Sequence, residues 1–353
     1  MKRLRVLHLD SGTTWRGGQR QVLLLALGLR ELGHEPFLIG APGSPLVERA
    51  RAAGLPAAAI PMAADWDVRA ARRIRARMRA WSVDIVHAHD ARSHALGIIA
   101  LLRNSRIPLV VTRRVAFQPR SVRLKYGPRV ARFIAISRAV RSAMIAGGVE
   151  ANRIDVVHSG IAIADSVTPR DWRRELGWPE DCVIAGVVGA MTVEKGIQSL
   201  EQIVKLMPAS SQERLRILFL GGSQKGQHQI GGVNSHFAGF VNDIENAIAG
   251  LDILLHPSSM EGLGTSIIDA MAQGVPPVAF DVGGIPEVIE HDVSGLLAPA
   301  GDLQAFATNA SRLASDYMLR ERLAEAARKQ ARNFNALAMT KGTEAVYNEV
   351  LRG

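Results

Sequence analysis

Short apolar runs alternate along the chain with amphipathic segments, and polar or glycine-rich loops separate the two kinds of segment. Apolar runs of this length predict buried strands, and apolar residues at three- and four-residue spacing predict helices. In the first half, the runs predict strands at 5–9, 36–39, 85–88, 109–112, 133–136 and 155–158. Helices are predicted over 18–32 and over 138–146, the latter behind Ser137, a residue type that caps helix N-termini.

A second set of elements follows the polar stretch 165–181. Its predicted strands lie at 183–188, 216–220, 236–238, 253–256 and 278–280. Its predicted helices lie at 197–206, 264–273, 285–290 and 303–314, and two more helical stretches follow. Strands that alternate with helices predict parallel sheets with right-handed crossovers. We therefore expect two doubly wound, Rossmann-like α/β domains facing a cleft: residues 1–165 and 166–336, with a helix at about 337–353 packed back on the first.

Composition narrows the class of protein. The 353 residues are 47% hydrophobic and 22% charged, which is typical of a globular chain. The single cysteine, Cys182, excludes an internal disulfide and disfavours a cysteine metal cage. No apolar run approaches the ~20 residues of a membrane-spanning helix, and the N-terminus lacks the apolar core of a secretory signal. We expect a cytoplasmic protein.

Charge divides unevenly between the two halves. Residues 1–165 carry 27 Lys+Arg against 11 Asp+Glu, a net of +16, and residues 166–353 carry 16 against 22, a net of −6. The basic half predicts a nucleic acid, a phosphorylated small molecule or an anionic membrane surface as partner, unless its arginines simply form a solvated face. Nucleic acid is disfavoured, because no recognition motif is present and only 5% of residues are aromatic.

The segment 68–81 concentrates this basic charge. An apolar stripe runs at helical spacing through Val68, Ala71, Ile74, Met78 and Trp81. Six arginines surround the stripe: Arg69, Arg72, Arg73, Arg75, Arg77 and Arg79. We expect the stripe to pack inward, and we leave open whether the arginines are merely solvated or meet the anionic inner face of a bacterial membrane.

Three loops that follow predicted strands carry candidate chemistry, because ligands of such sheets bind beyond the carboxyl ends of the strands. In 11–19, two glycines open a helix and allow an anion to approach backbone N–H groups. In 187–196, Lys195 precedes a helix and is able to reach a diphosphate. Each of these two signals is weak alone, since glycines also serve turns and loop lysines are usually solvated.

The third loop, 256–280, is the most informative. Glu261 precedes a helix that begins near Gly264, and Asp269 lies about one turn into that helix. Free N–H groups at a helix start suit phosphate oxygens, whereas carboxylates suit sugar hydroxyls. Either carboxylate alone also fits simple compensation of the helix dipole.

Over almost its whole length the sequence resembles the family-4 glycosyltransferases, which have the GT-B fold. The matching stretches are WRGGQ (15–19), DIVHAHD (84–90), AIS (135–137), EKG (194–196), EGLGTSIIDAMAQGVPPVA (261–279) and GGIPEVIEHDVSGLLAPAGD (283–302). The resemblance implies retaining transfer of a sugar from a nucleotide-diphosphate donor of UDP, GDP or ADP type, without a metal or other cofactor. It also implies a saccharide or lipid-linked acceptor, as in lipopolysaccharide, capsule or exopolysaccharide synthesis.

The resemblance assigns roles to individual residues. Glu261 and Asp269 occupy the two acidic positions of the family motif, Glu261 for hydroxyls of the transferred sugar and Asp269 for the ribose. Lys195 matches the lysine on the donor diphosphate. The remaining donor-binding positions are backbone donors near the two helix starts: Gly17, Gly18, Gly264, Thr265 and Ser266.

Two positions depart from the family pattern. Ala190 stands where an arginine is usual, so one charge partner of the diphosphate is missing. Arg114, beside Arg113, stands where a histidine is usual. The role of that histidine passes either to these guanidinium groups, which suit phosphate, or to His89 and Asp90 at the end of a neighbouring predicted strand. Residues 87–89 also have the composition of a metal site, but no third ligand at a clear spacing supports one.

Other functions remain open on the same scaffold. A hydrolase or epimerase acting on nucleotide sugars is disfavoured by the basic half that would face an acceptor. A catalytically silent partner subunit is suggested by Ala190 and Arg114, and Lys195, Glu261 and Asp269 argue against it. No residue is placed like an enzymic nucleophile, so the sequence favours same-face attack over double displacement.

Overall fold

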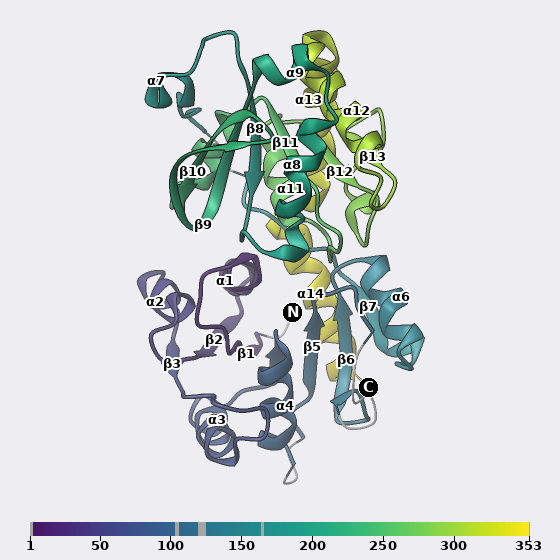
Figure 1. Ribbon diagram of the computed structural model, residues 1–353. Helices are drawn as coiled ribbons and strands as arrows, with labels where there is room; N and C mark the ends of the chain where they lie inside the picture. Colours follow the sequence, from purple (N-terminus) through teal and green to yellow (C-terminus); the bar gives the residue numbers. More distant parts are fainter. Residues whose placement is uncertain (1–2, 103–105, 119–124, 164–165, 353) are drawn as a thin grey trace. The chain divides into compact units, whose positions relative to one another are not determined.

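The computed structural model describes residues 3–102, 106–118, 125–163 and 166–352. The chain forms two compact units: unit 1 is Met1–Ala162 together with Asn335–Gly353, and unit 2 is Ile163–Phe334 (Figure 1). The domain boundary expected at residue 165 lies outside the described residues. Within the described residues, no helix combines the length and apolar character needed to cross a membrane.

Unit 1 is a parallel sheet between helices. Its strands are β1 (Arg5–Leu9), β2 (Glu35–Gly40), β3 (Ala57–Ala59), β4 (Ile85–Ala88), β5 (Leu109–Arg113), β6 (Val130–Ala135) and β7 (Ile154–Val156). Its helices are α1 (Gly17–Glu31), α2 (Pro45–Ala52), α3 (Val68–Ala80), α4 (Ala91–Ala100), α6 (Arg138–Ala146), η1 (Ala151–Arg153) and α14 (Ala336–Arg352). The strand order is β3-β2-β1-β4-β5-β6-β7, and every pairing is parallel. The carboxyl ends of β1, β4 and β5 therefore lie side by side.

Helix α14 belongs to unit 1 although it closes the chain (Figure 1). Tyr347 is fully buried in the core that Leu4, Val6 and Leu29 share with the sheet. At Gly28 of α1, a Cβ atom would lie 2.3 Å from the hydroxyl oxygen of Thr340, so glycine permits the close approach of α1 and α14. The long sequence separation of this contact shows that unit 1 is complete only when both ends of the chain meet.

Unit 2 repeats the α/β plan. Its strands are β8 (Val183–Val188), β9 (Leu215–Ile230), β10 (Val233–Gly239), β11 (Ile253–His256), β12 (Pro277–Phe280) and β13 (Leu296–Ala298). Its helices are α7 (Trp172–Leu176), η2 (Val193–Lys195), α8 (Ile197–Lys205), α9 (Ala209–Arg214), α10 (Ile244–Ala249), α11 (Thr265–Ala272), η3 (Ile285–Glu287), α12 (Leu303–Ser315), α13 (Tyr317–Ala331) and η4 (Arg332–Phe334). The order β10-β9-β8-β11-β12-β13 places β8 and β11 side by side and parallel.

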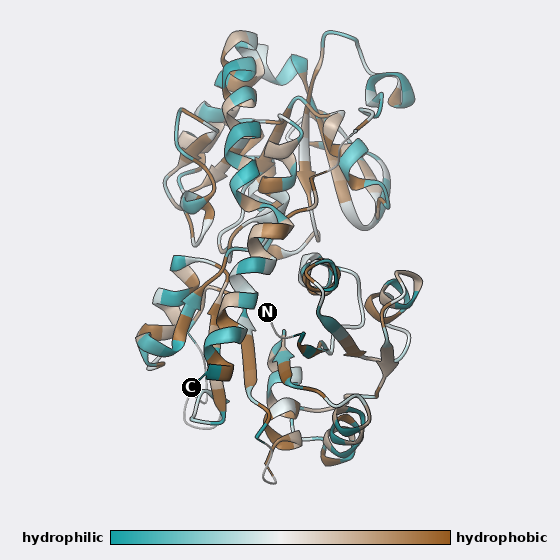
Figure 2. Cartoon of the chain, turned by 180° about the vertical axis from the view of Figure 1, so that it is seen from behind, coloured by the Kyte–Doolittle hydropathy of each residue, from teal (hydrophilic) through white to brown (hydrophobic). Residues whose placement is uncertain are grey.

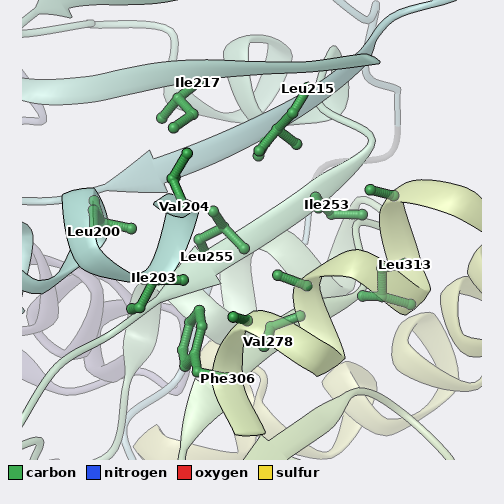
Figure 3. Packing of buried hydrophobic residues seen from close by; sticks show 14 of the residues in the cluster. Leu200, Ile203, Val204, Leu215, Ile217, Ile253, Leu255, Val278, Phe306 and Leu313 are labelled. Atoms are coloured by element: carbon green, nitrogen blue, oxygen red, sulfur yellow. The ribbon is translucent and has the colours of Figure 1, made fainter. Parts of the chain in front are cut away.

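The core of unit 2 forms where α8 and α12 cover the sheet. Leu200, Ile203 and Val204 of α8 and Phe306 and Leu313 of α12 gather with strand side chains such as those of Leu255 and Val278 (Figure 3). The helices carry alternating hydrophilic and hydrophobic stripes, as expected for elements that bury one side only (Figure 2).

Unit 2 departs from an all-parallel sheet at one edge. The glycine-rich stretch 221–232 belongs mostly to β9, which pairs antiparallel with β10. Antiparallel strands need only a short turn, and Gly231 and Gly232, both with positive φ, supply it. The expected helix 285–290 is only the 3₁₀ turn η3.

Helix α3 follows its predicted pattern with one correction. Ala71, Ile74 and Met78 are buried as expected, but Val68 is 53% exposed and Ala70 is buried instead. Val68 is the first residue of α3 and lies at its exposed end, and the helix packs against α4. Trp81 is half-buried and stacks on Phe37, with ring centroids 5.0 Å apart.

Candidate functional site

The loops after β8 and β11 lock together at the carboxyl edge of the unit 2 sheet. Gly196 has φ +69°, and a Cβ atom there would lie 1.8 Å from the carbonyl oxygen of Pro257. Gly283, with φ +56°, approaches the carbonyl oxygen of Glu261 equally closely. Only glycine tolerates both the backbone angle and the contact, so these two residues set the position of the Lys195 and Glu261 loops.

Lys195 and Glu261 form an ion pair, with Nζ 2.5 Å from Oε2. His256, buried at the end of β11, places Nε2 3.2 Å from the same oxygen and 3.0 Å from the hydroxyl oxygen of Ser258. Since the Glu261 carboxylate only accepts, His256 donates from Nε2 and Ser258 accepts. The backbone N–H of Gly262 donates to Glu261 Oε1 at 3.2 Å. The carboxylate is therefore held ionised and oriented.

Titration of this cluster follows from those contacts. Burial on its own raises the pKa of Glu261, but the hydrogen bond from His256 and the charge of Lys195 outweigh burial and lower that pKa to about 2. Burial lowers the pKa of His256, and the carboxylate of Glu261 opposes this only in part. At neutral pH His256 is thus a neutral imidazole and Glu261 a carboxylate.

Helix α11 begins directly behind Glu261. Gly264 is its N-cap with φ +89°, and no side chain of the described residues caps the helix there. Thr265 and Ser266 form the first turn and are half-buried, and Asp269 is 8% exposed. An uncapped helix start offers N–H groups and a favourable dipole to an anion. The structure therefore brings Lys195, Glu261 and the start of α11 together in the loops that follow β8 and β11 of unit 2.

In unit 1, the carboxyl ends of β1, β4 and β5 carry a second group of predicted residues. Arg114 follows β5, and its Cδ lies 3.8 Å from the position of a Cβ atom on Gly18, in the first turn of α1. Its Nη2 lies 3.4 Å from Nδ1 of His89, and its buried Nε has no hydrogen-bond partner among the described residues. The N-cap of α1, Arg16, gives no side-chain cap in the part of the chain described. A buried, unpaired N–H beside an uncapped helix start suits an anion.

Asp90 and Arg113 lie nearby but are engaged in holding the chain. Asp90 is the N-cap of α4, accepts from the backbone N–H groups of Arg92 and Ser93, and binds Ser11 through its hydroxyl and backbone N–H at 2.7 and 2.6 Å. It therefore fastens the β1–α1 loop. Arg113 donates to the Tyr126 hydroxyl and to the Phe117 carbonyl, each at 2.7 Å.

His8, His87 and His89 gather beneath this edge, with candidate ligand nitrogens within 4.8 Å of one another. The donor set fits a metal ion poorly. Both ring nitrogens of His87 are hydrogen-bonded at 2.6 Å, to the hydroxyls of Tyr347 and Thr112. The guanidinium of Arg114 contacts His89, and a divalent ion beside this half-buried cation would be repelled.

Sequence reasoning missed three residues of these sites. His256 and Ser258 orient Glu261, and Asp10 lies 2% exposed at the end of β1, bound by the side chain of Gln19 at 3.0 Å. Burial, followed by the charge of Asp90, raises the pKa of Asp10. The available signal was positional: Asp10 and His256 are polar residues that end or directly follow a buried apolar run, where strand ends meet.

Comparison with known proteins gives a consistent result. Residues 15–165 match the model of Glycosyltransferase Family 4, and residues 169–330 match that of Glycosyl transferases group 1. The sulfoquinovosyl transferase SQD2 of Arabidopsis thaliana is 28% identical over 297 residues, 76% of this chain and 57% of that protein. The chain spans about half the length of the curated relatives it matches.

Solved structures share the fold over nearly the whole chain. The crystal structure of Anabaena Alr3699/HepE in complex with UDP-glucose aligns with a TM-score of 0.86 at 20% identity, covering 98% of this chain and 100% of that one. The lipopolysaccharide outer core galactosyltransferase WaaB aligns with a TM-score of 0.73 at 15% identity, covering 98% of this chain and 100% of that one. With both halves matched by the corresponding family models and both units built as Rossmann-like α/β domains, the chain belongs to the family-4 glycosyltransferases of GT-B fold.

Proposed function

We propose that this chain transfers a sugar, with retention of configuration, from a nucleotide-diphosphate donor to a saccharide or lipid-linked acceptor. The observation that carries the proposal is the Lys195–Glu261 pair in the loops that lead to the uncapped start of α11. An ammonium group and free N–H groups suit a diphosphate, while an oriented carboxylate suits sugar hydroxyls. UDP-sugars are the first donors to test, since Alr3699/HepE binds UDP-glucose.

The reaction breaks the bond between the anomeric carbon and the diphosphate oxygen. Positive charge develops on the sugar and negative charge on the diphosphate, which Lys195, the α11 N–H groups and Arg114 stabilise. The acceptor hydroxyl attacks on the same face, and its proton passes to the departing phosphate oxygen. Glu261 is already bound by Lys195, His256 and the N–H of Gly262, which supports a binding role for it rather than a nucleophilic one.

The two acidic positions allow a direct test. Glu261→Ala should weaken binding of the intact nucleotide sugar more than binding of the nucleotide diphosphate, because Glu261 is assigned to sugar hydroxyls. Asp269→Ala should weaken both, because both ligands contain ribose. Calorimetric titration of each variant with both ligands measures the split, and Glu201→Ala on the exposed side of α8 is the control. Equal losses for both ligands in both variants would refute the assignments.

Products distinguish transfer from the competing reactions. Incubation with donor and a panel of saccharide and lipid-linked acceptors should give a glycoside whose anomeric configuration, read by NMR coupling constants, equals that of the donor. Free sugar without glycoside would indicate a hydrolase. An inverted product would refute retention.

We further place this function at the cytoplasmic face of the membrane, in the synthesis of a surface polysaccharide or glycolipid. Exposed arginines of α3 carry the argument: Arg69, Arg72, Arg73, Arg77 and Arg79. None of the five forms an ion pair with a carboxylate in the described ranges. Arg75 is different, because it donates to the carbonyls of Ile99 and Ala100. Trp66 and Val68, each 53% exposed, add apolar contact at the helix start.

Each basic residue near an anionic bilayer contributes about 1 kcal/mol, so this helix face favours reversible docking. Flotation with liposomes should show binding that rises with anionic lipid and falls in high salt. The triple variant Arg72→Glu, Arg73→Glu, Arg77→Glu should lose it, whereas Arg174→Glu, Lys205→Glu, Lys329→Glu in unit 2 changes charge equally and should retain it. A wild type that stays unbound at low salt would instead favour a soluble acidic acceptor.

A further inference from the structure

Two buried histidines, His8 and His89, and the half-buried Arg114 form a continuous hydrogen-bonded chain at the carboxyl edge of the unit 1 sheet. Nη2 of Arg114 lies 3.4 Å from Nδ1 of His89, and Nε2 of His89 lies 3.0 Å from Nδ1 of His8. The two imidazole rings are stacked, with centroids 5.2 Å apart. The three residues come from three neighbouring strand ends, β5, β4 and β1, so the sheet itself brings them together.

The guanidinium fixes the order of protons along this chain. Arginine only donates, so Nδ1 of His89 must accept and the ring proton of His89 must sit on Nε2. That proton is donated to Nδ1 of His8, which places the proton of His8 on its own Nε2. This last nitrogen is buried and has no hydrogen-bond partner among the described residues. Each ring thus has a single tautomer, set from the arginine end.

The hydrogen-bonded chain of His8 and His89 orients the positive charge of Arg114 without neutralising it. Burial lowers the pKa of His8 to about 3 and lowers the pKa of His89 well below its usual value. Both rings are therefore neutral at pH 7. The carboxylate of Asp10 acts on Arg114 through its charge, but no hydrogen bond joins the two within the described structure. A guanidinium held by neutral acceptors keeps its charge for an external anion.

We propose that His89 is a positioning residue for Arg114, with His8 behind it, and that this chain aims the guanidinium at the departing diphosphate. The proposal rests on the proposed function, in which Arg114 stabilises that diphosphate. It assigns His89 no contact with substrate. An oxygen of the departing phosphate accepts from the exposed part of the Arg114 guanidinium, while Nη2 remains tied to the ring of His89.

Isosteric replacements separate positioning from simple filling of the core. Asparagine carries an oxygen on Cγ, where histidine carries Nδ1, whereas the terminal atoms of glutamine lie near Nε2. His89→Asn should keep the acceptor for Arg114 and retain kcat within about threefold of the wild type. His89→Gln and His89→Leu should each lower kcat about 10-fold, with little change in KM for the donor. If kcat instead follows the melting temperature across the three variants, His89 is merely structural and the proposal fails.

A double-mutant cycle links the effect to Arg114. In the Arg114→Ala background, His89→Leu should lower kcat no further. Additive losses would overturn the proposal and leave the role of Arg114 intact. An Arg114→Ala variant with full kcat would instead remove arginine from the proposed function, so the two failures are distinguishable.

Spectroscopy tests the proton order in the unaltered protein. Histidine ¹⁵N shifts should report His8 and His89 as neutral rings protonated on Nε2 at pH 7. Arg114→Ala removes the donor to Nδ1 of His89, so it should give a mixture of tautomers at His89. Protonation on Nδ1 of His89 in the wild type would contradict the proposed order of protons from Arg114 to His8.

Discussion

Each unit carries one proposed diphosphate cation at the carboxyl edge of its sheet, but the two cations have opposite kinds of partner. Lys195 in unit 2 is paired at 2.5 Å with the carboxylate of Glu261. Arg114 in unit 1 is held by the neutral ring of His89. An ion pair orients a cation and neutralises it, whereas the neutral ring of His89 orients Arg114 without cancelling its charge, and the nearby carboxylate of Asp10 acts on it without a hydrogen bond.

The difference matters because the two side chains differ physically. A lysine ammonium is a mobile point charge, and pairing keeps it near Glu261 until a diphosphate competes for it. An arginine guanidinium is planar and presents several donors, so a fixed orientation leaves others directed at the ligand. We infer that Lys195 exchanges partners on donor binding, while Arg114 acts from a fixed position.

Lys195→Ala should have the largest effect. It removes the cation assigned to the diphosphate and also leaves the half-buried carboxylate of Glu261 without its ion-pair partner. We expect kcat/KM to fall about 10³-fold, with weaker donor binding as well as slower turnover. Steady-state kinetics over a donor series measures both. The matched control is Lys205→Ala, an exposed lysine paired with Glu201, and a loss of similar size there would point to general damage.

Arg114→Ala should come next, with kcat lower by about 10²-fold. Donor binding should change less than in Lys195→Ala, because the role of Arg114 grows as the leaving group gains charge. Arg114→Lys should recover only part of the loss, since an ammonium lacks the planar set of donors. A severe effect of His89→Leu with a fully active Arg114→Ala enzyme would reverse the assignment of roles.

The smallest expected effect is a difference between the two units in how far acid lowers their folding stability. His8, His87, His89 and His94 are buried in unit 1 with lowered pKa values, about 3 for His8 and about 4 for His94. The unfolded chain binds protons near pH 6.5 where the folded unit does not, so stability falls as pH drops below about 6.5 and continues to fall toward pH 4. Each such histidine contributes a slope of about 1.4 kcal/mol per pH unit.

In unit 2, two described histidines, His236 and His256, also have lowered pKa values, so unit 2 loses stability in this window through fewer groups than unit 1. Asp10, whose pKa is raised, favours the folded unit 1 at low pH, and the stabilisation that ionised Glu261 gives unit 2 is lost only as pH falls below about 4.5 toward 2. Hydrogen exchange at pH 7 and pH 5.5, corrected for intrinsic rates, should show β1 and β4 losing protection before β8 and β11. Earlier loss in β8 and β11 would contradict this order.

The sequence predicted the buried parallel strands best. β4 and β8 match their predicted bounds, since strands covered on both faces form continuous apolar runs. The β9–β10 hairpin was missed because its second half is polar and glycine-rich, with no apolar period to detect. β3 and β13 are three-residue strands and too short to give a pattern.

The candidate site was predicted unevenly for a related reason. Lys195 and Glu261 stand in family motifs, so the resemblance alone predicts that they lie together, and the structure pairs them. His256 and Asp10 act through neighbours brought to them by folding, such as Gln19 one turn into another element. In the sequence, His256 and Asp10 look like ordinary polar residues. Only the register of the strands shows which side chains they contact.

Thermal melting against a panel of UDP-, GDP- and ADP-sugars shows whether the protein has a nucleotide-sugar site built on Lys195 and Glu261. A ligand at 100 times its Kd stabilises the folded state by about 2.7 kcal/mol. We predict that one nucleotide class raises the melting temperature of the wild type and of Lys205→Ala by several degrees, and that Lys195→Ala loses most of this rise. Equal stabilisation of Lys195→Ala, or no stabilisation of the wild type by any donor, would contradict a nucleotide-sugar site built on Lys195 and Glu261.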